Sequence, residues 1–292
     1  MRTWKANFNY DHYIIAILLC GLSALVSCSH PRIHNDNDLT TGNLRGPVKS
    51  ITESCRSSSD TLNPCKSSFN TLSWRFDFNR QGYITKRVKH TCDDSLHMVY
   101  TTIEDSEGRI ISSTQLPDDW AWFSRCTIKY DDADPIEMAD YNESGNMVLK
   151  VKYKYDVRHN KIEEALYNMP GERSNSKTTY KYDNKGNNIE RLVANNNDSQ
   201  IISKTIFTYD SKGYIKDESV IVDDTISSKM TYLYDTLGNR TAVDAYCPGE
   251  GEVSYKERYE YKYDAKGNWI YMKQYRDDSL MNICLRDIVY YN

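Results

Sequence analysis

The chain has 292 residues, a formal net charge of -4 and 24 tyrosines, and hydrophobic residue types make up 39% of it. Charges of both signs are interspersed without a basic patch, so nucleic acid is not an expected partner. Because tyrosine supplies much of the apolar content, the composition favours β-structure with polar faces over a thick aliphatic core.

Residues 1–27 have the layout of a secretory signal. Arg2 and Lys5 precede an apolar run at 14–26, and Cys28 follows it. That run holds 13 residues, whereas a membrane-spanning helix needs about 20, so an export signal is favoured over a transmembrane helix. Leu-Val-Ser-Cys at 25–28 resembles a bacterial lipobox. The resemblance implies that Cys28 becomes the lipidated first residue of a mature outer-membrane lipoprotein, facing the periplasm or the cell surface.

Residues 28–43 are predicted to be a flexible tether. Beyond Cys28 the segment is polar, with Asn-Asp-Asn-Asp at 35–38 and almost no apolar residues. A segment of this composition buries too little surface to fold. We therefore expect the lipid anchor to connect through this tether to a folded domain at 44–292.

An internal repeat organises residues 44–292. Eight units place a glycine or its substitute at 82, 108, 134, 159, 186, 213, 238 and 267, which are 25 to 29 residues apart. In units three and four, Asp134 and His159 stand at the glycine position. The four clearest units read Tyr/Phe-x-Tyr-Asp-x-x-Gly, and their turn residues are Asp183, Gly186, Asp210, Gly213, Asp235, Gly238, Asp264 and Gly267.

Each recurrent residue has a structural reason. Tyr-x-Tyr alternates, so both rings fall on one face of a strand. The Asp side chain caps a turn, and a residue in the left-handed conformation, normally Gly, closes the hairpin. Asp and His tolerate positive φ better than most residue types. A second turn is marked by Asp-Asp-Ser/Thr at 93–95, 223–225 and 277–279. One period is therefore strand, turn, strand, turn, which predicts one all-β domain of tandem antiparallel hairpins of about 26 residues.

The Tyr-Asp-x-x-Gly-Asn core resembles the YD repeats of the rearrangement-hotspot (RHS) family, over roughly residues 70–292. The chain resembles small Bacteroidetes-type lipoproteins built only from such units; MORN-type hairpin repeats are a near look-alike. Large RHS proteins wrap many more repeats into a shell around a toxin. With eight units and no toxin segment, we expect a curved, twisted meander sheet, open or partly rolled, rather than a closed shell.

Six cysteines remain once the signal and the lipidation site are set aside: Cys55, Cys65, Cys92, Cys126, Cys247 and Cys284. An even number in an exported protein suggests disulfides. Cys55 with Cys65 could cross one hairpin. Cys92 with Cys126, and Cys247 with Cys284, lie at similar repeat offsets and are the other candidate pairs.

No catalytic residue, metal or cofactor is predicted. Gly-x-Ser-x-Gly, His-Glu-x-x-His and phosphate-loop patterns are absent from the sequence. His90 and His97 flank a turn, where a solvated pair is preferred over a metal site. The aspartates recur as turn residues, so they provide no distinct pair of catalytic carboxylates, and they lack the alternating acidic ligands of calcium loops.

The tyrosines form the candidate binding surface. One interpretation makes them the core of a thin sheet, and the other a platform for sugar rings or a partner protein. The rings expected to stack along neighbouring hairpins are Tyr180, Tyr182, Tyr209, Tyr232, Tyr234, Tyr261 and Tyr263. Asp-Ser/Thr-aliphatic triplets at 60–62, 94–96, 224–226, 235–237 and 278–280 resemble a Bacteroidetes O-glycosylation sequon, although the same residues are ordinary turn formers.

Anchor, tether and repeats together predict a non-catalytic cell-envelope lipoprotein that has a structural role or binds a glycan or protein. One alternative is an envelope hydrolase or carbohydrate-processing accessory enzyme. Another is an immunity or chaperone partner of a secreted toxin, which only the RHS resemblance suggests.

Overall fold

The computed structural model describes residues 42–57, 71–90, 96–115, 124–168, 175–195, 200–248 and 254–292. All regular structure in these ranges is β-strand, which confirms the all-β prediction. None of the described segments forms a helix long and apolar enough to cross a membrane. The strands are β1 (Val48–Ser57), β2 (Thr71–Phe78), β3 (Ile84–His90), β4 (Leu96–Glu104), β5 (Ile110–Gln115), β6 (Arg125–Asp131), β7 (Asp134–Tyr141), β8 (Met147–Tyr155), β9 (Lys161–Asn168), β10 (Ser176–Tyr182), β11 (Asn188–Asn195), β12 (Ile201–Tyr209), β13 (Ile215–Val222), β14 (Thr225–Tyr234), β15 (Arg240–Tyr246), β16 (Tyr255–Tyr263), β17 (Trp269–Arg276) and β18 (Ser279–Tyr290).

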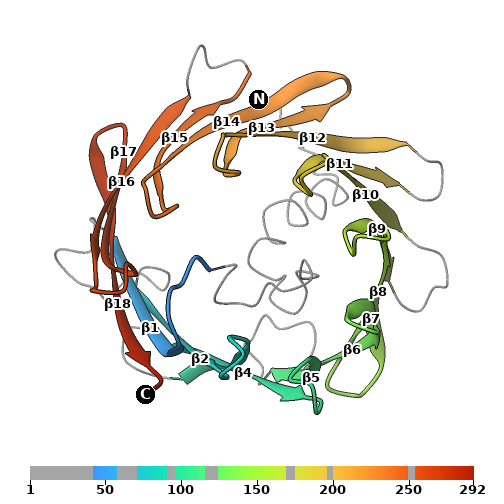
Figure 1. Cartoon of the computed structure of the whole chain (residues 1–292). Coiled ribbons are helices and arrows are strands. Elements are labelled where there is room, and N and C mark those ends of the chain that lie inside the picture. Colours follow the sequence, from blue (N-terminus) through green and yellow to red (C-terminus); the bar gives the residue numbers. More distant parts are fainter. Residues whose placement is uncertain are drawn as a thin grey trace, which may run out of the picture.

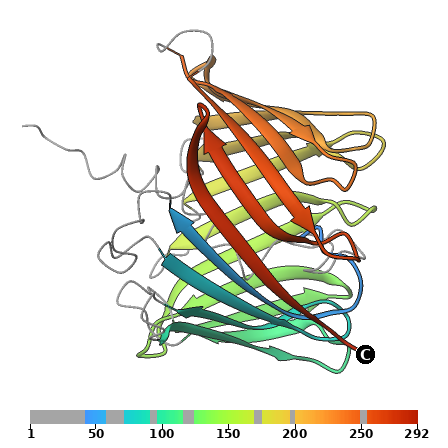
Figure 2. The same cartoon turned by 90° about the vertical axis from the view of Figure 1, so that its left-hand side faces the viewer.

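These strands form a closed antiparallel barrel. Each strand pairs with the next along the chain, and β1 pairs with both β2 and β18, which completes the ring (Figure 1). Figure 2 shows the tilted strands of the wall from the side. The expectation of an open or partly rolled sheet is therefore wrong. The eight repeats supply β2 to β17, and closure depends on β1 and β18, which lie outside the recurrent motif.

A bulge in each regular hairpin bends the sheet. Tyr182 pairs with Asn188 while Lys181 pairs with Glu190, so Ile189 is an extra residue on β11. The same register shift precedes Tyr209, Tyr234 and Tyr263 in the following units. Bulges increase local twist and bend the strand that carries them. A bend repeated once per unit curls the sheet in one direction, which is a physical reason for closure.

The tyrosines of the Tyr-x-Tyr motifs face the inside of the barrel. The segment before β1 runs inside the ring (blue in Figure 1), where its Asn43 side chain donates to Oδ1 of Asn239. Asn239 in turn donates to the Tyr263 hydroxyl. Along β16 half-buried Tyr259, Tyr261 and Tyr263 alternate with exposed lysine, arginine and glutamate side chains. On β16, one face therefore belongs to an aromatic inner wall, and the other to a charged outer wall.

Ion pairs between neighbouring strands cover much of the outer wall. Glu163 Oε1 lies 2.8 Å from Lys154 Nζ and its Oε2 lies 2.6 Å from Lys177 Nζ, which joins β8, β9 and β10. Glu190 bridges Lys181 and Lys204 in the same way across β10, β11 and β12. Exposed pairs of this kind each contribute at most about 1 kcal/mol, so their main effect is to make the outer surface polar.

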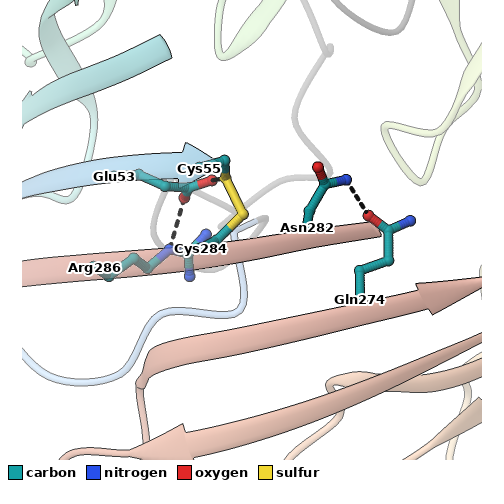
Figure 3. Close-up of a disulfide and its surroundings, with 6 residues drawn as sticks. All are labelled: Glu53, Cys55, Gln274, Asn282, Cys284 and Arg286. Atoms are coloured by element: carbon teal, nitrogen blue, oxygen red, sulfur yellow. Dashed lines mark hydrogen bonds and ion pairs between the residues drawn. A yellow bond between two sulfur atoms is a disulfide. The ribbon is translucent and has the colours of Figure 1, made fainter. Parts of the chain in front are cut away.

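A disulfide joins the two closing strands. Cys55 of β1 and Cys284 of β18 are directly opposed in register and bonded to each other (Figure 3). The predicted pairs Cys55–Cys65 and Cys247–Cys284 are therefore wrong, because closure places residues 229 positions apart on adjacent strands. Cys247 keeps its thiol. For the third pair, Cys126 is buried in β6, while Cys92, like Cys65, lies outside the described residues.

Candidate functional site

The turn at 183–187 illustrates how the regular units fold. Asp183 Oδ1 accepts the backbone N–H groups of Lys185 and Asn187 at 2.8 and 2.9 Å, and its Oδ2 accepts Asn187 Nδ2 at 2.9 Å. These bonds, led by that from the Asn187 side chain, lower the pKa of Asp183. Gly186 donates its N–H to the Asp183 carbonyl at φ +87°, where a Cβ would be strained. The matching residues of the next three units hold the same backbone hydrogen bonds: Asp210 with Gly213, Asp235 with Gly238, and Asp264 with Gly267.

The two units without glycine differ from each other. His159 takes the glycine conformation with φ +62°, whereas in unit three the positive φ falls on Asp132 and Asp134 opens β7. Asp134 therefore does not replace glycine as expected. Its Oδ2 instead lies 2.8 Å from Nδ1 of His159, so the two substitutes form a contact between consecutive turns.

The second ring of Tyr-x-Tyr bonds to the preceding unit. The Tyr182 hydroxyl donates to the Lys161 carbonyl at 2.8 Å, and that of Tyr209 to the Asn188 carbonyl at 2.6 Å. The hydroxyls of Tyr130 and Tyr155 make the same kind of bond, each to a backbone carbonyl of the unit before it, at 3.0 and 2.9 Å. Burial raises the pKa of Tyr182 to about 12. These rings have a structural role whatever else the inner wall does.

The first ring of Tyr-x-Tyr contacts acidic side chains of the inner wall. The Tyr180 hydroxyl donates to Glu164 at 3.3 Å and that of Tyr232 to Glu218 at 3.0 Å. Burial raises the pKa of both hydroxyls. Tyr234 stacks on Tyr214 with ring centroids 4.9 Å apart. These rings form a thin core layer that also lines the interior.

The densest aromatic group lies along β16 and β17. Tyr261 stacks on Tyr259 at 6.4 Å and contacts the rings of Tyr263 at 5.9 Å and Trp269 at 6.2 Å. Its hydroxyl donates to the Arg240 carbonyl at 2.7 Å, and burial raises its pKa to about 12. We call Tyr259, Tyr261, Tyr263 and Trp269 the β16 aromatic stack.

A buried cation borders this stack. The Arg286 guanidinium lies 3.5 Å from the Trp269 ring centroid, and its Nε donates to Glu53 at 2.8 Å (Figure 3). Burial lowers the pKa of Arg286, although Glu53 opposes that shift. Cations also lie over aromatic rings around the rest of the inner wall, in the pairs Arg87–Tyr100, Arg109–Tyr130, Lys161–Tyr180 and Arg240–Tyr232.

The sequence predicted that Tyr261 and Tyr263 belong to one aromatic surface, but Tyr259 and Trp269 were not among the predicted residues. The alternation rule could have found Tyr259, which is two residues before Tyr261. Hairpin register pairs Trp269 with Tyr263 and could have found it as well. Arg286 and Glu53 could not be found, because they meet only where β18 pairs with β1.

The predicted lipidation site, the tether and the histidine pair lie partly or wholly outside the described residues. Cys28 and the tether up to residue 41 lie outside the described residues, as does the side chain of His97. His90 ends β3, and within the described residues its buried Nδ1 has no hydrogen-bond partner. Within the described ranges, no group of three or more His, Cys, Asp or Glu side chains could hold a metal ion.

Comparison with known proteins gives likenesses in structure alone. No family model and no curated protein matches the sequence. A porin-like protein from Bacteroides uniformis is 11% identical over 84% of this chain and 98% of its own, with a TM-score of 0.46. One from Bacteroides vulgatus is 13% identical over 84% and 99%, with a TM-score of 0.39. A Tc holotoxin chain from Photorhabdus luminescens is 12% identical over 75% of this chain but 14% of its own, at 0.30. Similarity this low carries no information on function.

Proposed function

We propose that the chain is a non-catalytic, lipid-anchored protein of the cell envelope whose barrel holds a partner protein against its inner wall. The observation that carries this proposal is the placement of a polypeptide segment, residues 43–47, inside the ring. Its Arg45 backbone is paired with the Asn268 side chain of the inner wall. A protein partner is therefore favoured over a glycan, because the wall already recognises a polypeptide.

The two faces of the barrel support the same division of roles. An outward Lys or Arg costs about 2–4 kcal/mol at the centre of a bilayer, and the outer wall bears rows of ion pairs such as Lys181–Glu190–Lys204. Such a wall is suited to water. The inner wall has half-buried aromatic rings, which offer large and rigid contact surfaces to a partner.

Photo-crosslinking in intact cells tests the inner wall as the binding face. A photoreactive phenylalanine replaces Tyr259 of the β16 aromatic stack in one variant and Tyr167 in a matched control. Tyr167 belongs to the outer wall, where Lys150 and Lys152 lie over its ring. We expect protein crosslinks from position 259 and none from 167. Equal crosslinking, or none, would overturn the proposal, and crosslinks to carbohydrate alone would replace the protein partner with a glycan.

Anchoring has its own test. Cys28→Ala should abolish lipid labelling and release the protein from membranes. Cys20→Ala changes the other cysteine of the predicted signal region and is the matched control, for which labelling should persist. Lipid labelling of the Cys28→Ala protein at the wild-type level would remove the anchor from the proposal.

A further inference from the structure

Residues 43–47 cross two consecutive turns of the barrel rim, those of units seven and eight. The Arg45 N–H donates to Asn268 Oδ1 at 2.7 Å, and Asn268 Nδ2 donates back to the Arg45 carbonyl at 2.8 Å. One turn earlier, Asn43 Nδ2 donates to Asn239 Oδ1 at 3.1 Å and to the Leu237 carbonyl at 3.0 Å. Asn268 is 1% exposed, so its hydrogen bonds to Arg45 are shielded from water and fixed in geometry.

The asparagines after the glycines of units seven and eight carry this recognition. In unit eight the side-chain amide of Asn268 bonds to both the N–H and the carbonyl of Arg45. This pairing uses only the backbone of the bound segment, so it does not depend on that segment's side chain. The Arg45 side chain also occupies the space over the turn glycine, because an added Cβ at Gly267 would lie 3.2 Å from Arg45 Cδ. The extended segment thus lies where two neighbouring turns both present asparagine, and it fills the space over the second glycine.

The sequence has one other consecutive pair of units with asparagine at this position, Asn160 in unit four and Asn187 in unit five. Each donates Nδ2 to the aspartate of its own turn, at 3.0 and 2.9 Å. Among the described residues, the heavy atom nearest to a Cβ built at Gly186 is Asn160 Oδ1, at 4.0 Å. No described residue thus fills over Gly186 the position that Arg45 fills over Gly267, and the side chain of buried Asn160 lies at its edge.

Flanking charges distinguish the two turn pairs. Leu237 and Lys266 precede the glycines of units seven and eight, whereas Arg158 and Lys185 precede the matching positions of units four and five. The guanidinium of Arg158 reaches the next turn, where Nη1 donates to the Asn184 carbonyl at 3.5 Å. Arg158 is the one cation that the other turn pair lacks, and this added charge favours an acidic side chain at the place that Arg45 takes in the internal segment.

We propose that the Asn160–Asn187 turn pair is a docking site for an extended, acidic polypeptide segment of a partner protein. Asn187 pairs with the backbone of one residue of that segment, as Asn268 pairs with Arg45. The site rests on the proposed function only in taking the partner to be a protein. It adds a location on the rim, a binding mode and a charge preference.

The probe is the capped peptide Gly-Asn-Leu-Glu-Gly-Pro, the chain's own 42–47 sequence with Glu in place of Arg45. Titration into the isotope-labelled chain is followed through the side-chain amide signals of Asn160 and Asn187 by NMR. Both signals should shift, and the unchanged Arg peptide should bind more weakly. Loss of a two-point backbone pairing should weaken binding about five- to tenfold in Asn187→Ala.

Two further variants separate binding from turn stability. Asn187→Tyr places there the residue type that units one and six carry as Tyr83 and Tyr214, so the turn should persist while binding is lost. Asn146→Ala alters a turn of the same kind between β7 and β8 and should leave binding unchanged. No shift at millimolar peptide, or shifts confined to Asn239 and Asn268, would overturn the site. Crosslinking at position 259 would be unaffected by that failure, so the two proposals fail separately.

Discussion

Two regions of the barrel hold neighbouring strands together by different means. Across units three to six, each unit bonds to the one before through a tyrosine hydroxyl and a backbone carbonyl, as Tyr182 does with Lys161. At the seam formed by β1 and β18, the Cys55–Cys284 disulfide and the Glu53–Arg286 ion pair also join the strands (Figure 3). The repeats use recurrent hydrogen bonds, whereas the seam adds a covalent bond and an ion pair.

The difference follows from chain connectivity. Within a unit the turn keeps two strands adjacent, so little extra energy is needed to maintain their pairing. At the seam the partners are separated by 229 residues, and bringing them together costs more chain entropy than any hairpin does. A covalent bond at that position offsets the largest loop in the molecule.

Removing the disulfide should have the largest effect on stability. Cys55→Ala with Cys284→Ala should lower the free energy of unfolding by about 2–5 kcal/mol, because a long closed loop is released in the unfolded chain. Urea unfolding of the oxidised, reduced and double-variant proteins measures the change. Cys247→Ala removes a thiol outside the disulfide and is the control, with an expected loss below about 1 kcal/mol. A midpoint unaffected by reduction would mean that strand pairing alone maintains the seam.

This contrast also explains how much could be predicted from the sequence. The turns could be predicted because Asp183 and Gly186 recur with their partners a few residues away, where local geometry fixes the outcome. Closure and the disulfide could not, because they depend on curvature summed over all units. In the candidate site, Tyr261 and Tyr263 followed from alternation, but their neighbour Arg286 belongs to the seam and has no periodic signal.

Within the repeats, unit three contains a buried carboxyl group, Asp140, whose ionisation should lower the stability of the barrel. The side chain is 5% exposed, and its Oδ1 has no hydrogen-bond partner among the described residues. Burial raises its pKa from 3.8 to about 6, although a hydrogen bond from Cys126 opposes that shift. The folded state therefore holds this proton more tightly than the unfolded state, and stability should fall as pH rises from about 4 to about 6. Asp140→Asn should raise the free energy of unfolding at pH 7 by up to about 3 kcal/mol and remove this pH dependence.

The control for Asp140 is a carboxylate with the opposite shift. Asp217 accepts hydrogen bonds from Thr208 and Thr231, and its pKa is lowered even though burial acts the other way. Asp217→Asn should therefore destabilise the barrel at pH 7. Unfolding curves at pH 4.5 and pH 7 compare the stabilities of the two variants. Destabilisation by Asp140→Asn at pH 7 would contradict a raised pKa for Asp140.

Single tyrosine bonds between units should matter less than the seam. Tyr182→Phe removes the hydroxyl that donates to the Lys161 carbonyl and should cost about 1 kcal/mol. Tyr167→Phe, on the outer wall, should leave the free energy of unfolding within about 0.5 kcal/mol of wild type. If both substitutions had the same effect, the bonds between units would contribute nothing beyond the packing of the rings.

The smallest expected effect concerns the contact between His159 and Asp134. That contact raises the pKa of His159 above 6.5, chiefly through the hydrogen bond to the carboxylate. A raised histidine pKa stabilises the fold fully below the unfolded value and ceases to do so as pH rises through the folded one. NMR titration should give a His159 pKa above 6.5 in the wild type and a lower one in Asp134→Asn. His159→Gly loses the contact but suits the positive φ at this turn. That variant should be less pH-dependent than wild type without being less stable at pH 8, and if it were clearly less stable there, the histidine would contribute through packing rather than charge.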